Sequence, residues 1–382
     1  MDPGSQRRRR IAEIRAEPDV RPHATHGQPH LPRYTHGVTR VVAIILHAVP
    51  DASAGPLEAA FAAARAANAA RQARGFEAAG AISRIVETRA GGAPFGTRLR
   101  RLAALDAGAG IIVLGSGSVP LATAAERRAF VAAAGGAGHI LTNNRYSSDI
   151  LAIPSEVALA ELPHLPELTA DNRLPRWFSE RGFEVRDLLS KWRLQVDLDS
   201  PIDLLVAGLA GPDDPALARV RDAATRIRIC TADPRAQLLV AGRTSSDTVR
   251  WLEGHTASRT RALVEERGMR TAVPDQRPAR STLGLLLDRD RPEALGRILA
   301  ELADAAVIDT RVLLAHRLGP DETGWPAAED RFASDLLLHE GIDDPWLKAL
   351  TKAAATAAIP VLLGGHTLVG PGLRLLLQAR RR

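Results

Sequence analysis

The chain of 382 residues is poor in several residue types that point to particular protein classes. It holds one cysteine, Cys230, which excludes an intrachain disulfide and a zinc site built from cysteines. Aromatic residues make up only 4% of the chain and do not interleave with basic ones, so a stacking surface for single-stranded nucleic acid is not expected. No run of about 18 apolar residues occurs, which argues against a membrane-spanning helix. Because no apolar secretory segment opens the chain, we expect a cytoplasmic location.

Lysine is also scarce, since only Lys191, Lys348 and Lys352 occur among 50 basic residues. The net charge is +6, carried almost wholly by arginine. The densest basic clusters, Arg7–Arg10 and Arg380–Arg382, stand at the two ends of the sequence, where solvated tails are the usual outcome. The charge therefore does not favour nucleic acid as a partner.

The composition favours a folded protein, because 45% of the residues are hydrophobic and 25% are charged. The length suits two domains. Residues 1–40, rich in histidine, proline and arginine, are predicted to be a disordered basic leader. Residues 41–209 and 210–382 are predicted to be two domains of the α/β class.

Strand and helix patterns alternate in residues 41–209. Val41–Val49 is a continuous apolar run, typical of a strand buried on both faces of a parallel sheet. An alanine-rich helix is expected from Pro56 to about Gly75, and a second buried strand begins at Gly110. A helix should start at Thr123, because Glu126 follows at the spacing of a capping box. Alternation of this kind predicts a mostly parallel, Rossmann-like α/β sheet.

Residues 210–382 carry a similar alternation. We predict a strand in "AQLLVAGRTSS", a long helix over 246–267, further strands in 281–290 and 305–319, and a final strand, glycine-rich turn and helix. Asp309, Arg311, His316 and His366 stand near predicted strand ends and would form a polar pocket if those ends meet. We recognise no family for this half.

The sharpest chemical signal is "QVDLDSPIDL", residues 195–204. Asp197 and Asp199 are expected on one side of an extended segment, because strand side chains alternate. Two such carboxylates suit Mg²⁺, which takes oxygen ligands and substrate phosphates. The alternative is structural: Asp199 or Ser200 caps the following helix, and Asp203 lies in its positive first turn.

A Gly/Ser turn, "LGSGS", ends the predicted strand that begins at Gly110. At the carboxyl end of a parallel strand such a turn can bind a phosphate through backbone N–H groups. It can equally be a tight connection between a strand and a helix.

The motif "VDLDSPIDL" resembles the D-x-D-T-P-x-D-L signature of nucleotidyltransferases with the glycosyltransferase-A-like fold. The closest patterns are those of the 2-phospholactate guanylyltransferases and the molybdenum-cofactor nucleotidyltransferases. "GIIVLGSGSVPL", "HILTNNRYSSDILAIP" and "DNRLPRWFSERGFEVRDL" are similar to other segments of these enzymes and fall in the same order. The resemblance covers residues 41–209.

The resemblance implies transfer of a nucleotidyl group from a nucleoside triphosphate to a phosphorylated or acidic small molecule, with Mg²⁺ as cofactor. It assigns Asp197 to the metal, and together with the carboxylate pair described above we expect Asp197 and Asp199 to bind the metal and to be catalytic. The residues that it places around the substrate, together with the turn described above, are Gly115, Ser116, Gly117, Ser118, Thr142 and Asn143. The second domain would cover the site or mediate dimerisation.

Two departures from the family pattern leave a second hypothesis open. Ser118 stands where the family has its first metal-binding acid, and the phosphate-binding lysine has no counterpart, because no lysine precedes Lys191. The alternative is a protein that has kept the fold and lost the chemistry, and that binds a nucleotide or sugar nucleotide as a sensor or scaffold.

Overall fold

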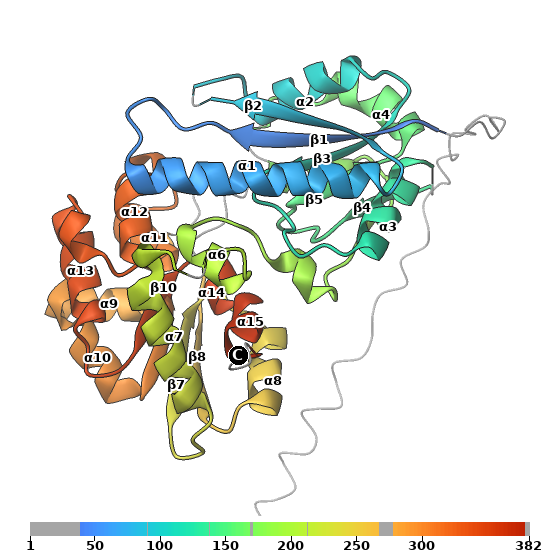
Figure 1. The fold of residues 1–382 in the computed structure, drawn as a ribbon. Coiled ribbons are helices and arrows are strands. Elements are labelled where there is room, and N and C mark those ends of the chain that lie inside the picture. The colour runs from blue at the N-terminus through green and yellow to red at the C-terminus, as the bar shows by residue number, and fades with distance from the viewer. Residues whose placement is uncertain are drawn as a thin grey trace, which may run out of the picture. The chain divides into compact units, whose positions relative to one another are not determined.

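The strands of the computed structural model form two sheets, one from each half of the chain (Figure 1). The first sheet has the order β2-β1-β3-β5-β4-β6 and the second the order β10-β9-β7-β8. The strands are β1 Val41–Ala48, β2 Ile82–Thr88, β3 Gly110–Gly115, β4 Ile140–Thr142, β5 Ile150–Ile153, β6 Val185–Asp187, β7 Gln237–Gly242, β8 Arg259–Val264, β9 Ala305–Asp309 and β10 Val361–Gly364.

The structure describes residues 39–89, 91–136, 138–168, 171–211, 213–266 and 278–378. The predicted leader, with its four histidines, lies outside these residues except for its last two positions. Residues 39–378 belong to one compact unit. Among the described residues no helix is both long and apolar enough to cross a membrane.

Every strand pairing in the second sheet is parallel. In the first sheet only β5 runs against its neighbours, β3 and β4. Parallel neighbours need crossover segments, and helices supply them throughout. The predicted α/β class with a mostly parallel sheet is therefore confirmed.

The helices occupy both faces of each sheet. They are α1 Pro56–Glu77, α2 Phe95–Ala104, α3 Ala124–Ala134, α4 Ser155–Glu161, α5 Leu174–Glu180, α6 Pro201–Val206, α7 Ala218–Thr231, α8 Ser246–His255, α9 Thr282–Asp290, α10 Leu295–Leu302, α11 Thr310–Leu318, α12 Ala328–Asp335, α13 Pro345–Ala355, α14 His366–Val369 and α15 Gly372–Gln378.

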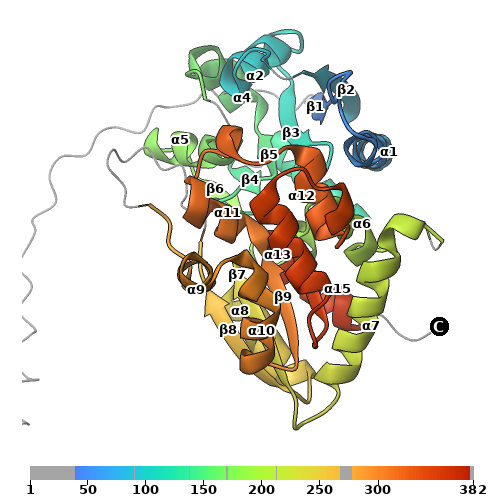
Figure 2. The same cartoon turned by 90° about the vertical axis from the view of Figure 1, so that its left-hand side faces the viewer.

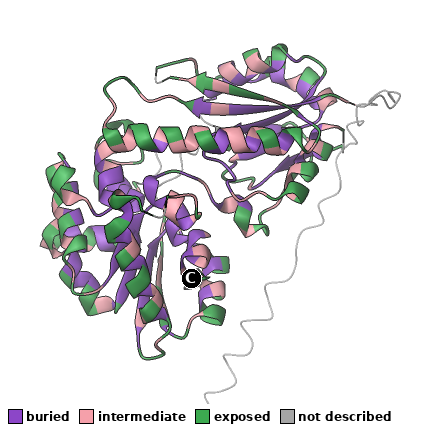
Figure 3. Ribbon diagram, in the orientation of Figure 1, coloured by how far each residue is buried: buried purple, intermediate pink, exposed green. Residues whose placement is uncertain are grey.

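The first sheet is buried on both faces because β1 carries apolar side chains on both sides of the pleat from Val41 to Leu46. Val41, Ala43 and Ile45 pack against α1 and α3, whereas Val42 and Ile44 pack on the side of α2, α4 and α5. Buried residues run along β1 and β3 in Figure 3, while the outer faces of the helices are exposed. The continuous apolar run of β1 thus has the burial predicted for it.

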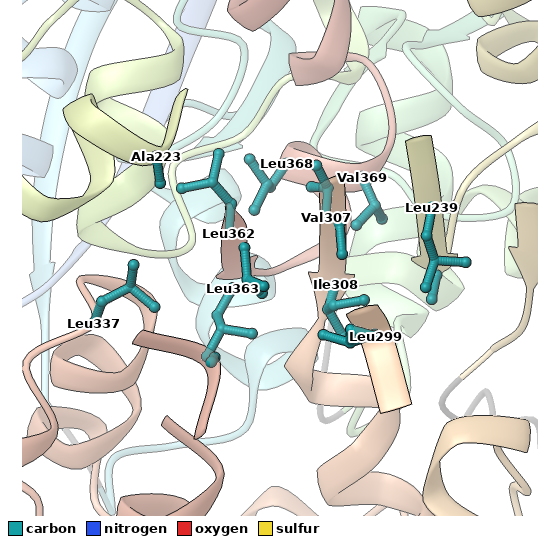
Figure 4. Packing of buried hydrophobic residues seen from close by; sticks show 14 of the residues in the cluster. Ala223, Leu239, Leu299, Val307, Ile308, Leu337, Leu362, Leu363, Leu368 and Val369 are labelled. Carbon is teal, nitrogen blue, oxygen red and sulfur yellow. The ribbon is translucent and has the colours of Figure 1, made fainter. Parts of the chain in front are cut away.

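The second sheet lies between α7 and α15 on one side and α10 and α13 on the other (Figure 2). Its core joins strand side chains such as Val307 and Leu362 to Leu299 of α10 and Leu368 of α14, as Figure 4 shows. Apolar strands covered on both faces exclude water from a large part of this half.

The two halves share packing. Ile202 of α6 lies in the core of the second sheet, although α6 precedes residue 209. Phe61 of α1, Leu198 and Phe332 of α12 form a smaller cluster, in which the two phenylalanine rings meet edge to face at 5.0 Å. The division at residue 209 separates the strands of the two sheets, and as a boundary between domains it stays a prediction.

Several predicted elements are wrong. The helix predicted over 246–267 ends at His255 and is followed by β8. The segment 281–290 is helix α9, in which Leu283 and Leu287 are buried four residues apart, and 305–319 is a strand followed by α11. The extended segment expected around Asp197 forms no strand, and a 3-10 turn, Trp192–Gln195, precedes it. Short apolar runs fit either a strand or a helix, and tertiary packing decides between them.

Candidate functional site

The acidic loop of residues 196–200 joins the carboxyl ends of strands from both sheets. Leu198 N donates to the carbonyl oxygen of Gly117, after β3, at 3.1 Å. The hydroxyl of Thr367, after β10, accepts from Asp197 N at 3.1 Å and donates to the Asp197 carbonyl oxygen at 3.0 Å. The acidic loop therefore lies directly against the Gly/Ser turn. The loop also reaches the second sheet at the edge where α/β proteins bind ligands.

Gly117 makes this close approach possible. A Cβ atom there would lie 2.6 Å from the Leu198 carbonyl oxygen and 3.1 Å from Asp197 Oδ1. Any side chain would push the acidic loop away from β3. The glycine of the turn is therefore required by packing, whether or not the turn binds a ligand.

Buried and more exposed side chains alternate along the acidic loop, although no strand forms there. Val196, Leu198 and Ser200 are buried, whereas Asp197 is half-buried and the Asp199 side chain is 51% exposed. Ser200 is the N-cap residue of α6, and Asp203 lies in the first turn as the structural alternative predicted; its carboxylate accepts from Asp199 N at 2.9 Å and from Ser200 N at 2.8 Å. The side chain of Asp199 is therefore not used to cap α6.

The surroundings shift the pKa values of Asp197 and Asp199 in opposite directions. Burial, with the nearby charges of Asp199 and Asp149, raises the pKa of Asp197 well above its usual range, against the opposing influence of Arg65. Desolvation also acts on Asp199, but the hydrogen bond and charge of His366 outweigh it and hold the pKa of Asp199 below its usual range. The His366 Nδ1 atom lies 3.5 Å from Asp199 Oδ2.

The two carboxylates suit a small hard cation whose other ligands come from water and a bound substrate. Asp197 and Asp199 offer carboxylate oxygens, and a cation between them would relieve the repulsion that disfavours the charge of Asp197. Among the described residues no group of three or more His, Cys, Asp or Glu side chains could hold a metal ion. Mg²⁺ is compatible with this set, because it is commonly bound by one or two carboxylates plus water and substrate phosphates.

A cleft of about 510 Å³ opens beside the acidic loop. It is lined by residues after β1 and β2, by α1 and α12, and by the loops after β7, β9 and β10. A smaller pocket of about 190 Å³ at the carboxyl ends of β1 and β3 shares Ala48, Arg65 and Thr88 with it. The cleft has the volume of a typical small-molecule site, whereas the smaller pocket beside it does not.

Two arginines at the second sheet's edge are already paired. Arg243 binds Asp309 through Nε at 2.6 Å, and Arg311 binds Asp335 through two contacts at 2.5 and 2.7 Å. Asp309 approaches so closely that a Cβ atom on Gly242, whose φ is +124°, would lie 2.2 Å from the Asp309 Cβ. These two pairs bury charge within the protein and leave little positive charge for a ligand.

Two other cleft arginines are less satisfied. The Nε atoms of Arg65 and Arg331 are buried and have no hydrogen-bond partner among the described residues. Arg331 has one ion pair, with Glu322 at 3.5 Å. Burial, then the charge of Arg311, lowers the pKa of Arg331, against the opposing charges of Glu322 and Asp335.

The residues of the predicted substrate turn are mostly engaged with the protein itself. Gly115 lines the smaller pocket. The Ser116 hydroxyl is hydrogen-bonded to His47 Nδ1 at 3.1 Å, and the Ser118 hydroxyl accepts from Gly115 N at 3.1 Å. Asn68 Nδ2 donates to the carbonyl oxygens of Ser116 and Ser118. The turn is thus held in one shape by side chains from β1 and α1.

Thr142 and Asn143 are fully buried in a polar network at the end of β4. The Thr142 hydroxyl bonds to Ser148 Oγ and the Ile150 carbonyl oxygen, both at 2.9 Å. Asn143 Nδ2 donates to Asp149 Oδ2 at 2.7 Å. Both side chains therefore organise the polar turn between β4 and β5, whereas neighbouring Ser148 and Asp149 line the smaller pocket.

The structure brings Asp309, Arg311 and His366 to the same edge of the second sheet, but His316 lies elsewhere. His316 Nδ1 accepts from Ser281 N at 3.0 Å, and its Nε2 lies 3.0 Å from Asp288 Oδ2. It is a hydrogen-bonded structural histidine next to α9.

Sequence patterns did not single out Arg243, Arg331, Phe332 or Thr367. Arg243 directly follows a strand, and that position is the one signal that could have marked it. Arg331 and Phe332 occupy an ordinary amphipathic helix, and nothing local distinguishes them from a solvated face.

We compared the chain with family models, with curated proteins and with solved structures, and none of them matched.

Proposed function

We propose that the protein is a nucleotidyltransferase that binds a nucleoside triphosphate and Mg²⁺ at the acidic loop and transfers the nucleotidyl group to a phosphorylated or acidic small molecule. The observation that carries the proposal is the position of the acidic loop: Asp197 lies directly against the Gly115–Ser118 turn, and Asp199 lines the cleft. The proposal also rests on the resemblance of "VDLDSPIDL" and the neighbouring motifs to the glycosyltransferase-A-like nucleotidyltransferases.

Asp197 and Asp199 would hold the metal ion. Bound Mg²⁺ neutralises charge on the triphosphate and favours in-line attack at the α-phosphorus. An acceptor phosphate or carboxylate oxygen forms the new bond to phosphorus as the bond to the departing pyrophosphate breaks. Such an acceptor carries no proton at neutral pH, so this chemistry needs no general base.

The position of His366 accounts for the difference between the two aspartates. Its contact with Asp199 keeps that carboxylate ionised, while Asp197 stays the more basic of the two. Thr367 holds the backbone of Asp197 at both its N–H and its carbonyl. A preorganised pair of this kind needs little rearrangement when a cation arrives.

A second candidate function is binding without catalysis. Ser118 stands at the position of the family's first metal acid, and its hydroxyl is engaged with Gly115 N. Such a serine supplies no charge to a magnesium site. A sensor or scaffold that binds a nucleotide or sugar nucleotide without metal fits this feature.

A thermal-shift screen with the nucleoside triphosphates, each with and without Mg²⁺, distinguishes the two. The enzyme should be stabilised by one triphosphate only when Mg²⁺ is present, by about 2.7 kcal/mol at a hundredfold excess over Kd. Asp197→Asn should remove the effect. The control is Asp222→Asn, because Asp222 is a 72% exposed carboxylate on α7. Pyrophosphate release with phosphorylated hydroxy acids as acceptors then tests the transfer itself.

Stabilisation that needs no Mg²⁺ and survives Asp197→Asn would support the binding protein instead. No response to any triphosphate under either condition would contradict both functions.

A further inference from the structure

Arginines from both halves of the chain line the cleft. Arg65 projects from α1 and Arg331 from α12, and both line the cleft. The other two cleft arginines on the second half, Arg243 and Arg311, are neutralised by Asp309 and Asp335. Of the other three arginines that line the cleft, Arg89 is exposed, whereas Arg65 and Arg331 are half-buried and offer a ligand the more fixed positive charge.

Aromatic rings lie beside both arginines. The Arg65 guanidinium carbon lies 6.0 Å from the centre of the Phe61 ring, which meets Phe332 edge to face. Arg331 precedes Phe332 in α12 and extends over Trp325, with 5.9 Å between the guanidinium carbon and the ring centre. Phe61 and Phe332 are buried, so their rings are held in place.

Both guanidinium groups retain donor capacity. Each has a buried Nε–H without a partner among the described residues, and leaving such a donor unsatisfied costs about 1–3 kcal/mol. Guanidinium groups bind phosphate oxygens through parallel N–H donors, and a phosphate offers enough oxygens for two of them. Such a donor calls for a partner, which can be a water molecule, an ion or a ligand group.

We propose that Arg65 and Arg331 form a phosphate subsite in which each half of the chain supplies one guanidinium group. The subsite adds a phosphate-binding group to the proposed function. It rests on that function only for the identity of the molecule that carries the phosphate, which is either the nucleotide or a phosphorylated acceptor. The subsite gives the second half of the chain a direct part in ligand binding. It also supplies positive charge for the phosphate through arginine, because no lysine precedes Lys191.

The test measures binding of inorganic tripolyphosphate and pyrophosphate to the full chain by calorimetry, in EDTA so that no metal takes part. Arg331→Gln and Arg65→Gln should each raise Kd roughly tenfold or more, since a hydrogen bond to a charged group contributes at least that much. Arg331→Lys keeps the charge without the planar donors, and its Kd should lie between wild type and Arg331→Gln.

Arg128→Gln is the matched control, because Arg128 is an exposed arginine on α3 outside the cleft and its loss changes the net charge equally. Its Kd should stay at the wild-type value. Circular dichroism and melting temperature show whether each variant is folded. If Arg331→Gln does not fold, the Arg331→Lys and Arg65→Gln variants carry the test.

Equal Kd values for wild type and the two cleft variants, or equal weakening by Arg128→Gln, would overturn the subsite. So would a failure of wild type to bind either polyphosphate. Polyphosphate binding that depends on both arginines, without any magnesium-dependent triphosphate effect, would support the subsite while the proposed transferase fails.

Competition identifies the source of the phosphate. If tripolyphosphate displaces the stabilising nucleoside triphosphate, the subsite holds the nucleotide. If the triphosphate and a phosphate monoester such as glycerol phosphate bind together, and only the monoester depends on Arg331, the subsite holds the acceptor. Both results support the subsite.

Discussion

The surroundings of Asp197 disfavour the negative charge of its carboxylate. It is partly buried and lies near Asp149 and Asp199, and these conditions raise its pKa. A neutral isostere removes the repulsion and the desolvation of a carboxylate. We expect Asp197→Asn to raise the melting temperature measured in EDTA, while Asp222→Asn leaves it nearly unchanged. A lower melting temperature for Asp197→Asn would show that the carboxylate stabilises the fold.

His47 makes the stability depend on pH. Burial, then the charge of Arg65, lowers its pKa below 6.5, against the opposing charge of Glu87. The folded protein thus binds this proton more weakly than the unfolded chain, so the free energy of unfolding falls as pH decreases below 6.5. His47→Asn cannot take up that proton. Its melting temperature should fall less than that of wild type between about pH 7 and 5. Parallel pH profiles would contradict this.

The start of α3 is stabilised by its own sequence. Thr123 Oγ1 accepts from Glu126 N at 3.2 Å, and the Glu126 carboxylate accepts from Thr123 N at 2.7 Å. Thr123→Ala removes one of these contacts and should lower the free energy of unfolding by about 1 kcal/mol. Thr123→Ser keeps the hydroxyl and should match wild type within a few tenths of a kcal/mol. Urea denaturation measures both, and equal losses in the two variants would rule out the cap as the cause.

The whole molecule depends on contacts between its two halves. Phe61 packs against Phe332, and the Glu329 carboxylate accepts from Leu57 N and Glu58 N at the start of α1. A carboxylate from one half therefore caps a helix of the other, at its positive end.

Phe61→Ala should consequently lower the free energy of unfolding of the protein by about 3–5 kcal/mol, as expected for a buried phenylalanine. Denaturation followed by tryptophan fluorescence and by circular dichroism should show one shared transition in wild type, because tryptophans occur in both halves. Two separate wild-type transitions, or a midpoint unchanged by Phe61→Ala, would show that the shared cluster does not couple the halves.

The sequence pattern predicted secondary structure correctly where the segment was long or the helix had a defined cap. The apolar run of β1, the helix beginning at Pro56 and the capping box at Thr123 all occur as predicted. The sequence pattern gave wrong secondary structure in residues 246–290. There β8 and α9 are short, and their apolar residues fit the period of a helix as well as that of a strand. Longer segments gather enough side chains on one face for the period to be unambiguous.

In the candidate site, sequence alone determined which residues carry chemistry and on which segment: the two aspartates at 197 and 199, and a small-residue turn after a buried strand. Only the tertiary structure decided what faces them. Arg65 and Arg331 are 266 positions apart in the sequence and line one cleft because α1 and α12 share an aromatic contact. Local preferences act over a few residues, whereas such a cleft depends on packing between elements distant along the chain.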